Sequence, residues 1–487
     1  MKHLLHPSTL LAALHLSLVL GISIRVIMRR PNTGVALTWL FLVGAIPYGG
    51  AALYFLLGER RISRKRARRI EARKADYERL VQLGIERGLT NVDWRQHPEE
   101  AREMDLLGTH MIGFPTVPGS SGKLLSNTEE ILEALARDID NAEHCVFMEF
   151  YIWNEGGKAD EVLEALIRAT ERGVQCRVLI DALGARTWWK SKQPRQLRDA
   201  GVQLQQALPV GIIRTLVDRT DLRLHRKIVV IDGKVAWTGS MNMVDPRFFK
   251  QEANVGEWVD AMVRLEGPVV APLNLTMIGD WSLETEETVE DLITDSRLDG
   301  VAPGEGVDIQ VVPSGPGETD DGLLQMLLTT INSADRELVL TTPYFVPDES
   351  LLRAMRGAAA RGVDVHIVLP EKVDSLLTRY ASRSYYDELM NEGIQIHLYR
   401  AGLLHTKSIT ADEKITMFGT VNLDMRSIWI NYEVALFIYG EDVGREIRAL
   451  QQEYLDDSEL IDPEEWSQRS HGIKFLENAC RLTGPLL

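Results

Sequence analysis

Two apolar stretches near the N-terminus precede a longer region in which short apolar runs alternate with amphipathic segments. Residues 8–24 and 34–57 carry no charged residue. The second stretch is 24 residues long, enough to cross about 30 Å of hydrocarbon at about 1.5 Å per residue. We therefore expect a two-helix transmembrane hairpin within residues 1–60, with spans at about 8–28 and 35–57. A cleaved signal peptide is the alternative for the first stretch, but a second apolar stretch follows it at once.

Basic residues flank the second stretch. Residues 60–74 hold nine Lys or Arg, whereas the link between the stretches holds three. The positive-inside rule then places both ends of the hairpin, and the chain after it, in the cytoplasm. The basic run also lies where it would attract anionic lipid head groups, at about 1 kcal/mol per charge. We expect residues 61–105 to form a basic juxtamembrane linker or helix.

Beyond about residue 106 the same order of segments occurs twice. Each half has a helical stretch, an apolar run, a second helical stretch, a glycine and a second apolar run; in the first half these are 129–141, 146–153, 160–172 and 174–180, and in the second 323–333, 338–346, 351–361 and 363–369. The local texts ERGVQCRVLI and ARGVDVHIVL match in pattern. Alternating strands and helices predict an α/β sandwich. We therefore expect two duplicated α/β lobes, at 106–300 and 301–487.

Charge and cysteine content narrow the functional classes. The net charge is −16, and residues 1–74 hold thirteen Lys or Arg and two Glu, so the remainder carries −27. An acidic body disfavours a nucleic-acid-binding enzyme. The three cysteines, Cys145, Cys176 and Cys480, are too far apart for a zinc knuckle or a disulfide framework. The sequence has no motif that requires a metal or an organic cofactor, so we expect neither.

One constellation of polar residues occurs in each lobe at equal spacing. Histidine is followed by lysine after two residues, by aspartate after seven and by asparagine after seventeen. The members are His225, Lys227, Asp232, Ser240 and Asn242 in the first lobe, and His405, Lys407, Asp412, Thr420 and Asn422 in the second. One copy would arise by chance fairly often. Two matched copies in matched lobes indicate a shared site.

The segments HRKIVVID and HTKSITAD are typical of strands, on which residues two apart point to one face. Each histidine should therefore lie beside its lysine. Asp232 and Asp412 fall on the opposite face or in a turn, and we expect them to shape the site more than to touch substrate.

Two histidines and two lysines suit cleavage of a phosphodiester. One imidazole can attack phosphorus, and the other can protonate the leaving oxygen and later deprotonate the incoming hydroxyl. Lysine ammonium groups, together with the groups of Asn242, Asn422, Ser240 and Thr420, would hold the phosphoryl oxygens. The near-symmetry of the motifs leaves open which histidine is the nucleophile.

The two motifs resemble HxKxxxxD followed by GSxN, the signature of the phospholipase D superfamily. Within it, the chain is most similar to bacterial cardiolipin synthases, through segments that include YFLLGERR, LHRKIVVIDG, TGSMNMVDPRFFKQ, TTPYFVP and GTVNLDMRS. The resemblance implies two α/β lobes around one site, a phosphohistidine intermediate, and transfer of a phosphatidyl group between two phosphatidylglycerol molecules to give cardiolipin and glycerol. His225, Lys227, Asp232, His405, Lys407 and Asp412 are then the expected catalytic residues. Thr420 replaces the usual serine but keeps its hydroxyl group.

The resemblance also implies a carboxylate behind each histidine. Asp260 and Glu433 each lie seven residues before a glycine, Gly267 and Gly440, and we expect them to fix the imidazole tautomers. It further implies membrane-lipid substrates and a multi-pass protein of the bacterial cytoplasmic membrane. The sequence does not indicate an oligomeric state.

Other functions stay open at this point. A membrane-bound phospholipase D would hydrolyse the same intermediate, and sequence does not report the access of water to the site. A tethered nuclease conflicts with the acidic body, and a non-catalytic scaffold conflicts with two intact motifs. The aromatic segments EFYIW and TPYFVP are either core strands or the lining of an acyl-chain entrance. The tail, residues 466–487, is either a packed helix or an amphipathic helix on the bilayer.

Overall fold

The computed structural model describes residues 7–29, 33–58, 63–209, 211, 219, 221–298, 304–318 and 321–484. The chain forms two compact units. Unit 1 consists of residues 1–65 and 210–221, and unit 2 of residues 66–209 and 222–487. Each unit is described separately below.

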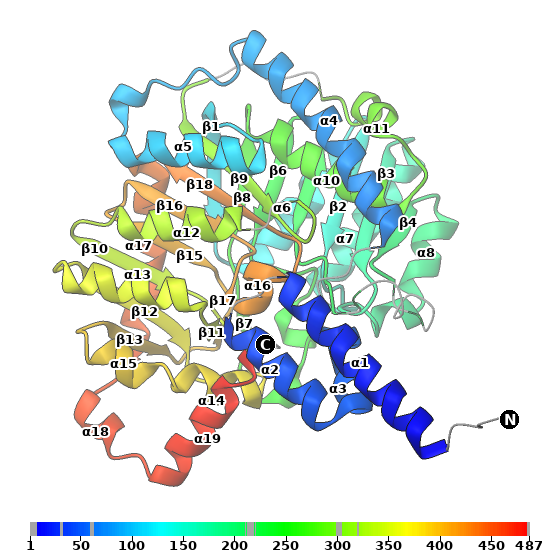
Figure 1. Cartoon of the computed structure of the whole chain (residues 1–487). Coiled ribbons are helices and arrows are strands. Elements are labelled where there is room, and N and C mark those ends of the chain that lie inside the picture. Colours follow the sequence, from blue (N-terminus) through cyan, green and yellow to red (C-terminus); the bar gives the residue numbers. More distant parts are fainter. Residues whose placement is uncertain are drawn as a thin grey trace, which may run out of the picture. The chain divides into compact units, whose positions relative to one another are not determined.

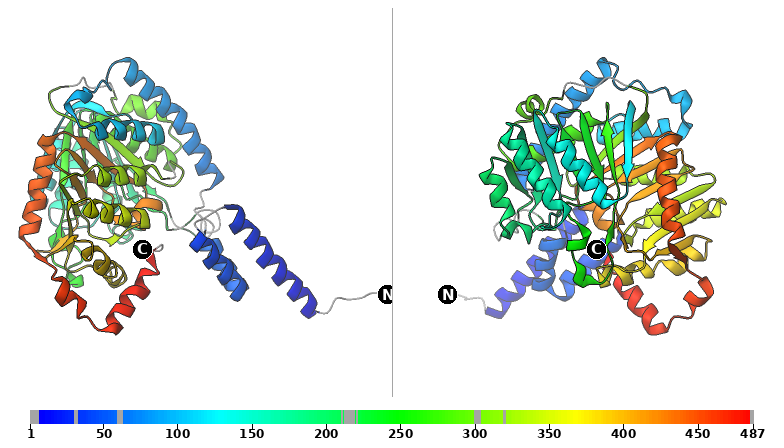
Figure 2. Two further views of the ribbon diagram at one scale, coloured as in Figure 1. Left: turned by 60° about the vertical axis from the view of Figure 1, so that its left-hand side comes forward. Right: turned by 180° about the vertical axis from the view of Figure 1, so that it is seen from behind.

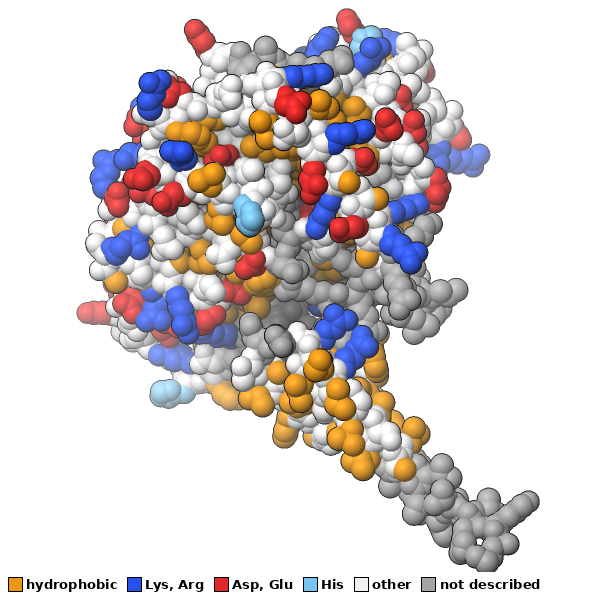
Figure 3. Space-filling model, turned by 45° about the horizontal axis from the view of Figure 1, so that its top comes forward, with side chains coloured by type: hydrophobic (Ala, Val, Ile, Leu, Met, Phe, Trp, Pro, Cys, Tyr) orange, Lys and Arg blue, Asp and Glu red, His pale blue; other side chains and the backbone are white. Residues whose placement is uncertain are grey.

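Unit 1 contains three apolar helices, α1 (Pro7–Arg29), α2 (Thr33–Ala45) and α3 (Pro47–Leu57). Ile22, Val26, Val43 and Tyr54 pack together between them. The side chains that point outward are also largely apolar, as the space-filling view of this unit shows (Figure 3). Phe41, for example, is 77% exposed. An outer surface of this kind is unusual for a helix that faces water.

The apolar stretch expected to form one span from 35 to 57 is divided into α2 and α3. The break is at Ile46, whose backbone is non-helical, and Pro47 begins α3. Proline fixes its own backbone angle and has no N–H group, so it starts a helix more readily than it continues one. Across the described parts of the chain, none of the helices combines the length and apolar character needed to span a bilayer. The expected two-helix hairpin is therefore not confirmed.

Unit 2 is built on one mixed sheet, which has fifteen strands within the described residues (Figure 1). The first half of the sheet contains, in spatial order from the middle outward, β1 (Val117–Leu125), β8 (Met262–Glu266), β6 (Val235–Gly239), β5 (Ile228–Ile231), β2 (Cys145–Phe150), β3 (Gln175–Asp181) and β4 (Gln203–Ala207). The second half contains β9 (Val307–Ser314), β18 (Glu433–Tyr439), β16 (Ile415–Gly419), β15 (Ser408–Ala411), β10 (Glu337–Thr341), β12 (Asp364–Pro370), β13 (Gln395–Tyr399) and β19 (Ser458–Leu460).

The two halves correspond strand for strand. They meet where β1 pairs antiparallel with β9. Outward from that seam, each half has four antiparallel pairings and then two parallel ones, for example β2 with β3 and β10 with β12. Among the described strands, β19 is the one without a counterpart in the first half. This duplication confirms the expected α/β fold with two repeated lobes, and the seam makes the lobes parts of one sheet.

Alternate side chains on each strand enter different cores. In β2, Val146 and Met148 face the outer helices α6 (Thr128–Asp140) and α7 (Lys158–Glu171), whereas Phe147 enters a core shared by both lobes. In the second lobe the outer helices are α12 (Gly322–Asn332) and α13 (Glu349–Ala360). The shared core also includes α10 (Val270–Glu284) and α17 (Glu441–Asp456). Figure 2 shows α17 on the side of its lobe opposite α12 and α13. The motif strands β5 and β15 are buried between these layers.

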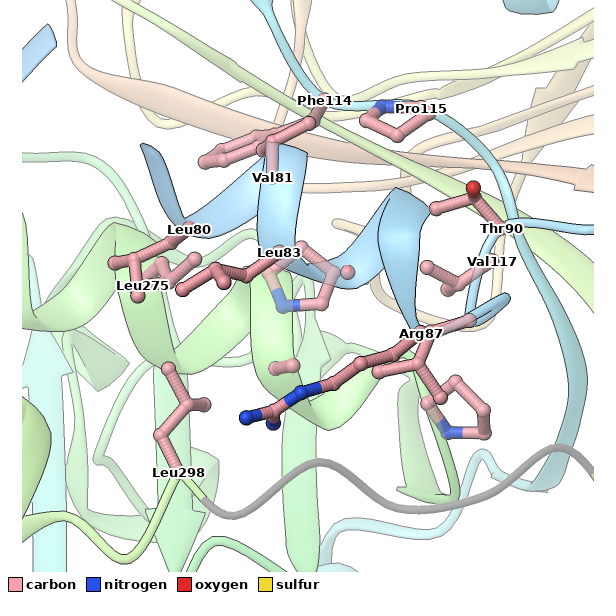
Figure 4. A pocket seen from close by; sticks show the side chains of 15 residues that line it. Leu80, Val81, Leu83, Arg87, Thr90, Phe114, Pro115, Val117, Leu275 and Leu298 are labelled. Atoms are coloured by element: carbon pink, nitrogen blue, oxygen red, sulfur yellow. The ribbon is translucent and has the colours of Figure 1, made fainter. Parts of the chain in front are cut away.

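Helix α4 (Arg64–Glu86) belongs to unit 2 from Arg66 onward. It packs against α10, where the hydroxyl of Tyr77 donates to the carbonyl oxygen of Leu275. Its N-terminal half forms ion pairs with the body: Arg66 with Glu284 at 2.5 Å, Arg69 with Glu286 at 2.8 Å, and Arg73 with Glu318 at 2.6 Å. Its C-terminal half and α10 enclose an apolar pocket of about 130 Å³, lined by residues that include Leu80, Leu83, Phe114 and Leu275 (Figure 4). Three of the nine basic residues expected to face lipid head groups therefore bind the protein itself.

The C-terminal tail forms α18 (Pro463–Ser467) and α19 (His471–Arg481), and α19 packs along α14 (Leu376–Arg383). Arg383 of α14 donates to the buried Glu477 of α19 at 2.7 Å. One side of the tail helix is thus packed against the second lobe. Its other side exposes Phe475 and Leu482, so the packed helix is confirmed and contact with a bilayer stays a prediction.

Candidate active site

The histidine and lysine of each motif immediately precede a central strand instead of lying in it. β5 begins at Ile228 and β15 at Ser408. The backbone before each strand pairs with the other lobe: His225 N donates to Tyr432 O at 2.9 Å, and His405 N donates to Val259 O at 2.8 Å. Each histidine is therefore positioned by a strand of the opposite lobe.

The two imidazoles are bonded crosswise to the expected carboxylates. Nδ1 of His225 lies 2.8 Å from Oε2 of Glu433 in the second lobe. Nδ1 of His405 lies 2.6 Å from Oδ1 of Asp260 in the first lobe. A carboxylate only accepts hydrogen bonds, so each Nδ1 carries the hydrogen and each Nε2 keeps its lone pair. Sequence spacing indicates these carboxylates but does not indicate that they are exchanged between lobes.

Ser240 and Thr420 lie behind the carboxylates. The hydroxyl of Ser240 donates to Asp260 at 2.6 Å, and that of Thr420 donates to Glu433 at 2.6 Å. Each hydroxyl oxygen also accepts a backbone N–H, from Ala261 and Val434 respectively. Both side chains are fully buried. In this geometry their hydrogens are donated to the carboxylates, and the expectation that they contact phosphoryl oxygens stays a prediction.

Lys227 and Lys407 are fully buried and bond back to their own motifs. Nζ of Lys227 donates to the carbonyl oxygen of His225 at 2.6 Å, and Nζ of Lys407 donates to that of His405. Burial lowers the pKa of Lys227 to about 8, although Glu433 and Asp260 oppose that shift. Burial likewise lowers the pKa of Lys407 well below its ordinary value. Each ammonium group keeps further N–H donors for a bound anion.

Electrostatic coupling shows that the two motifs share one site. Burial is the largest cause that lowers the pKa of His225 and of His405 to about 4. The bonded carboxylate opposes the shift in each case, whereas the charges of both Lys227 and Lys407 add to it. Both imidazoles are therefore neutral near pH 7 in the surroundings that the protein itself provides. An anionic phosphodiester would offset the lysine charges and raise both pKa values.

The asparagines contribute amide groups at the same place. Oδ1 of Asn242 accepts from Ile152 N at 3.2 Å, which leaves its buried Nδ2 without a hydrogen-bond partner among the described residues. Asn422 is also buried, and its Oδ1 has no partner in the same part of the structure. A buried amide N–H that lacks an acceptor costs about 1–3 kcal/mol, so the donor of Asn242 is suited to a phosphoryl oxygen.

Asp232 and Asp412 lie in the turns at the far ends of β5 and β15, and each adopts a positive φ, 53° and 54°. The carboxylate of Asp232 accepts three backbone N–H groups, from Glu143, His144 and Cys145, at 2.8 Å each. Asp412 accepts the three equivalent groups at the start of β10 at 2.9 Å each. They fix the strands on which the site is built. This placement agrees with the turn position expected for both residues, and the catalytic role that the motif resemblance implies stays a prediction.

Arg226, between His225 and Lys227, was not recognised from sequence. It is fully buried, and its guanidinium donates to Glu433 O at 2.8 Å, to Asp280 and to Glu318 at 2.5 Å. Arg73 of α4 bonds the same two acids. Glu149 lies nearby, and burial followed by the charge of Asp280 raises its pKa well above the ordinary value. The equivalent of Arg226 in the second motif is Thr406, which bonds Tyr454, so only the first motif is tied to α4.

Aromatic rings flank each histidine. The ring of Tyr151 lies edge-on to His225 with centroids 5.1 Å apart, and that of Trp258 lies 4.3 Å from His405. Beside Trp258, Lys250 of the first lobe bonds Asp374 of the second at 2.9 Å, and Tyr344 donates to the same carboxylate at 2.8 Å. The EFYIW and TPYFVP segments thus supply Tyr151 and Tyr344 to the edge of the site, while most of their other side chains are core.

Comparison with known proteins agrees with this geometry. A family model described as cardiolipin synthase, PLD-like domain, matches residues 135–261 and 327–455. Cardiolipin synthase A of Erwinia tasmaniensis and that of Yersinia pestis are each 40% identical over 470 residues, which is 96% of this chain and 96% of the relative. The solved structure of phosphatidylserine synthase from Haemophilus influenzae Rd KW20 matches with a TM-score of 0.58 at 15% identity, over 79% of this chain and all of that one. This last likeness concerns the fold alone.

Proposed function

The chain belongs to the cardiolipin synthase family with phospholipase D-like domains, and on this premise we propose that it is a phosphatidyltransferase that makes cardiolipin. Two phosphatidylglycerol molecules are the substrates, and cardiolipin and glycerol are the products. The observation that carries the proposal is the pair of crosswise His–carboxylate contacts, because each fixes Nδ1 and leaves Nε2 of its imidazole for the reaction, one as the nucleophile and the other as the proton carrier.

The reaction proceeds in two displacements at phosphorus. In the first, Nε2 of one histidine forms a bond to phosphorus, the bond to the glycerol oxygen breaks, and that oxygen takes a proton from the other imidazole. In the second, the hydroxyl of the acceptor lipid gives its proton to that imidazole and attacks phosphorus. The P–N bond breaks, and its electron pair returns to the histidine.

The remaining polar groups stabilise charge. The ammonium groups of Lys227 and Lys407 and the amides of Asn242 and Asn422 would hold the non-bridging oxygens as charge develops. Asp260 and Glu433 keep each Nδ1 protonated and stabilise an imidazolium when it forms. The acid needs its proton at neutral pH, and the negative charge of the bound phosphodiester supports this by raising the histidine pKa.

We further propose that unit 1 attaches the enzyme to the bacterial cytoplasmic membrane and that the lobes lie on the cytoplasmic side. The outward-facing apolar side chains of α1, α2 and α3 support attachment, and the basic residues from 60 to 74 support the orientation. Protease digestion of sealed inverted vesicles tests this: the lobes should be digested without detergent, and protection would contradict the orientation.

The experiment that tests the activity uses full-length protein in mixed micelles of phosphatidylglycerol with EDTA present, and product identification by mass spectrometry. We expect cardiolipin and glycerol in equal amounts, and no product from His225→Ala or His405→Ala. Phosphatidic acid without cardiolipin would mean that water is the acceptor and the enzyme is a phospholipase D. Activity that requires a divalent cation would contradict the role of the two lysines.

A further inference from the structure

Helices α14 and α19 pack together at one end of the second lobe (Figure 1). They expose several large apolar side chains. Phe475 and Leu482 of α19 are 76% and 83% exposed, and Leu376 of α14 is 67% exposed. Leu377 of α14, and Ile473 and Leu476 of α19, are also exposed. We call these six residues the α14–α19 surface. Single exposed apolar residues are ordinary, whereas a cluster on two packed helices indicates a binding surface.

The charges on these helices are almost all positive. α14 contains no acidic residue, and α19 contains one, Glu477. That carboxylate is buried and is bonded to Arg383 at 2.7 Å and to Arg469 at 3.3 Å. Arg379 and Lys474 lie on the same helices. In a chain with 70 acidic residues and a net charge of −16, this surface is unusual and complements an anionic partner.

The surface begins at the edge of the active site. Ser375 caps α14, and the preceding residue, Asp374, accepts the bonds from Tyr344 and Lys250. Lys250, which bonds Asp374, lies over the ring of Trp258 at 5.4 Å, and that ring packs against His405 with centroids 4.3 Å apart. Leu376 is two residues after Asp374 along the chain. The exposed apolar side chains of this surface therefore begin next to the candidate active site.

We propose that the α14–α19 surface docks on the surface of an anionic lipid bilayer and thereby sets the mouth of the active site against the membrane. The proposal rests on the proposed function, because a lipid whose phosphate must reach buried His405 keeps its acyl chains in the bilayer. Phe475 of α19 and Leu482, directly after it, are seven residues apart and so lie on one side of the tail helix, with Leu476 beside them. Lys474 precedes Phe475, whereas Arg481 is paired with Glu388 at 3.0 Å. This arrangement is typical of helices that lie in the interface of a membrane.

Fluorescence quenching tests the contact directly. The three native cysteines are buried, so Phe475→Cys in the full-length protein provides a labelling site. Leu106→Cys is the matched control, because Leu106 is 61% exposed on α5 (Glu99–Ile112), which packs on a different part of the lobe. In nanodiscs of brominated phosphatidylglycerol we expect strong quenching at position 475 and none at 106. Equal quenching at both positions would overturn the proposal.

Kinetics provide the second test. Phe475→Ser combined with Leu482→Ser should lower cardiolipin formation in vesicles about tenfold, the effect of losing about 1.4 kcal/mol of apolar contact. Activity on short-chain phosphatidylglycerol below its micelle concentration should stay at the wild-type level. Leu106→Ser should change neither rate. Equal losses on both substrates, or a vesicle rate like that of the control, would overturn the proposal.

The outcomes separate docking from catalysis. If the wild type makes no cardiolipin but position 475 is quenched, the proposed function fails and docking stands. If cardiolipin forms without quenching, docking fails alone. If the wild type is a dimer that the double variant converts to a monomer, the surface binds a second copy and the proposal is wrong.

Discussion

Replacement of Arg73 by methionine tests whether α4 belongs to the catalytic machinery. Arg73 is 4% exposed, and it contacts Glu318 at 2.6 Å and Asp280 at 3.5 Å. The same acids hold Arg226, between His225 and Lys227. Arg73 and Arg226 thus face the carboxylates of Asp280 and Glu318, and burial raises the pKa of the nearby Glu149 well above its ordinary value. Arg73→Met keeps most of the side-chain volume but leaves one buried negative charge without a partner.

The expected losses in the stability of α4 and in kcat are large. Unit charges separated by the 3.5 Å of the Arg73–Asp280 pair attract by about 5 kcal/mol at an effective dielectric constant of about 20. Desolvation offsets part of this attraction, and removal of one partner of a buried pair typically costs about 3–5 kcal/mol. We expect the free energy needed to detach α4 locally to fall by that amount. Asp280 and Glu318 should then move, and Arg226, which they hold, should move with them and displace His225. A displacement of about 1 Å can lower kcat about 100-fold.

The assay compares Arg73→Met with Arg68→Met, which removes an exposed arginine from the same helix. Hydrogen exchange reports the opening of α4, and cardiolipin formation reports kcat. We expect fast exchange and low kcat for Arg73→Met, wild-type behaviour for Arg68→Met, and partial recovery when Glu318→Gln removes the surplus charge. If the two arginine variants behave alike, α4 does not support the site and the reasoning is refuted.

Three further predictions follow from the site and from α4. In whichever single His→Ala variant still forms phosphohistidine, removal of the carboxylate that bonds the deleted histidine should cause no further loss, whereas removal of the carboxylate that bonds the remaining histidine should; equal effects would contradict the crosswise pairing. KM should rise as pH increases through about 8, because Lys227 with a pKa of about 8 loses its positive charge there, and Lys227→Arg should remove this rise. Gly84→Ala should stabilise α4 by up to about 1 kcal/mol, because a Cβ there meets nothing within 4 Å; thermal unfolding measures the shift, and a lower midpoint would contradict this.

The sequence predicted which residues form the site better than it predicted which of them bond to each other. Equal spacing within each motif placed His225 beside Lys227, and turn chemistry placed Asp232 at the end of its strand. The partners of the histidines come from the other lobe, 208 and 145 residues away in sequence. Spacing within a lobe does not contain that information, because the seam between β1 and β9 decides which strands meet.

The less accurate expectations concerned the N-terminal region. The uncharged stretch 34–57 predicted one helix, although Pro47 within it favours a new helix start. The basic residues 60–74 indicated a lipid-facing segment, because their acidic partners, Asp280, Glu284 and Glu318, lie more than 200 residues further along the chain. Charge runs show where cations are, but only tertiary structure shows which of them face solvent.

The crosswise bonding of the imidazoles also bears on how the protein is made. His225 leaves the ribosome 208 residues before Glu433, a delay of about 10–40 s at about 5–20 residues per second. Throughout that interval the nascent first lobe has a histidine with neither its carboxylate nor its backbone partner, Tyr432. Until Glu433 has been translated, the first lobe therefore lacks the group that holds the imidazole of His225 in its reactive tautomer.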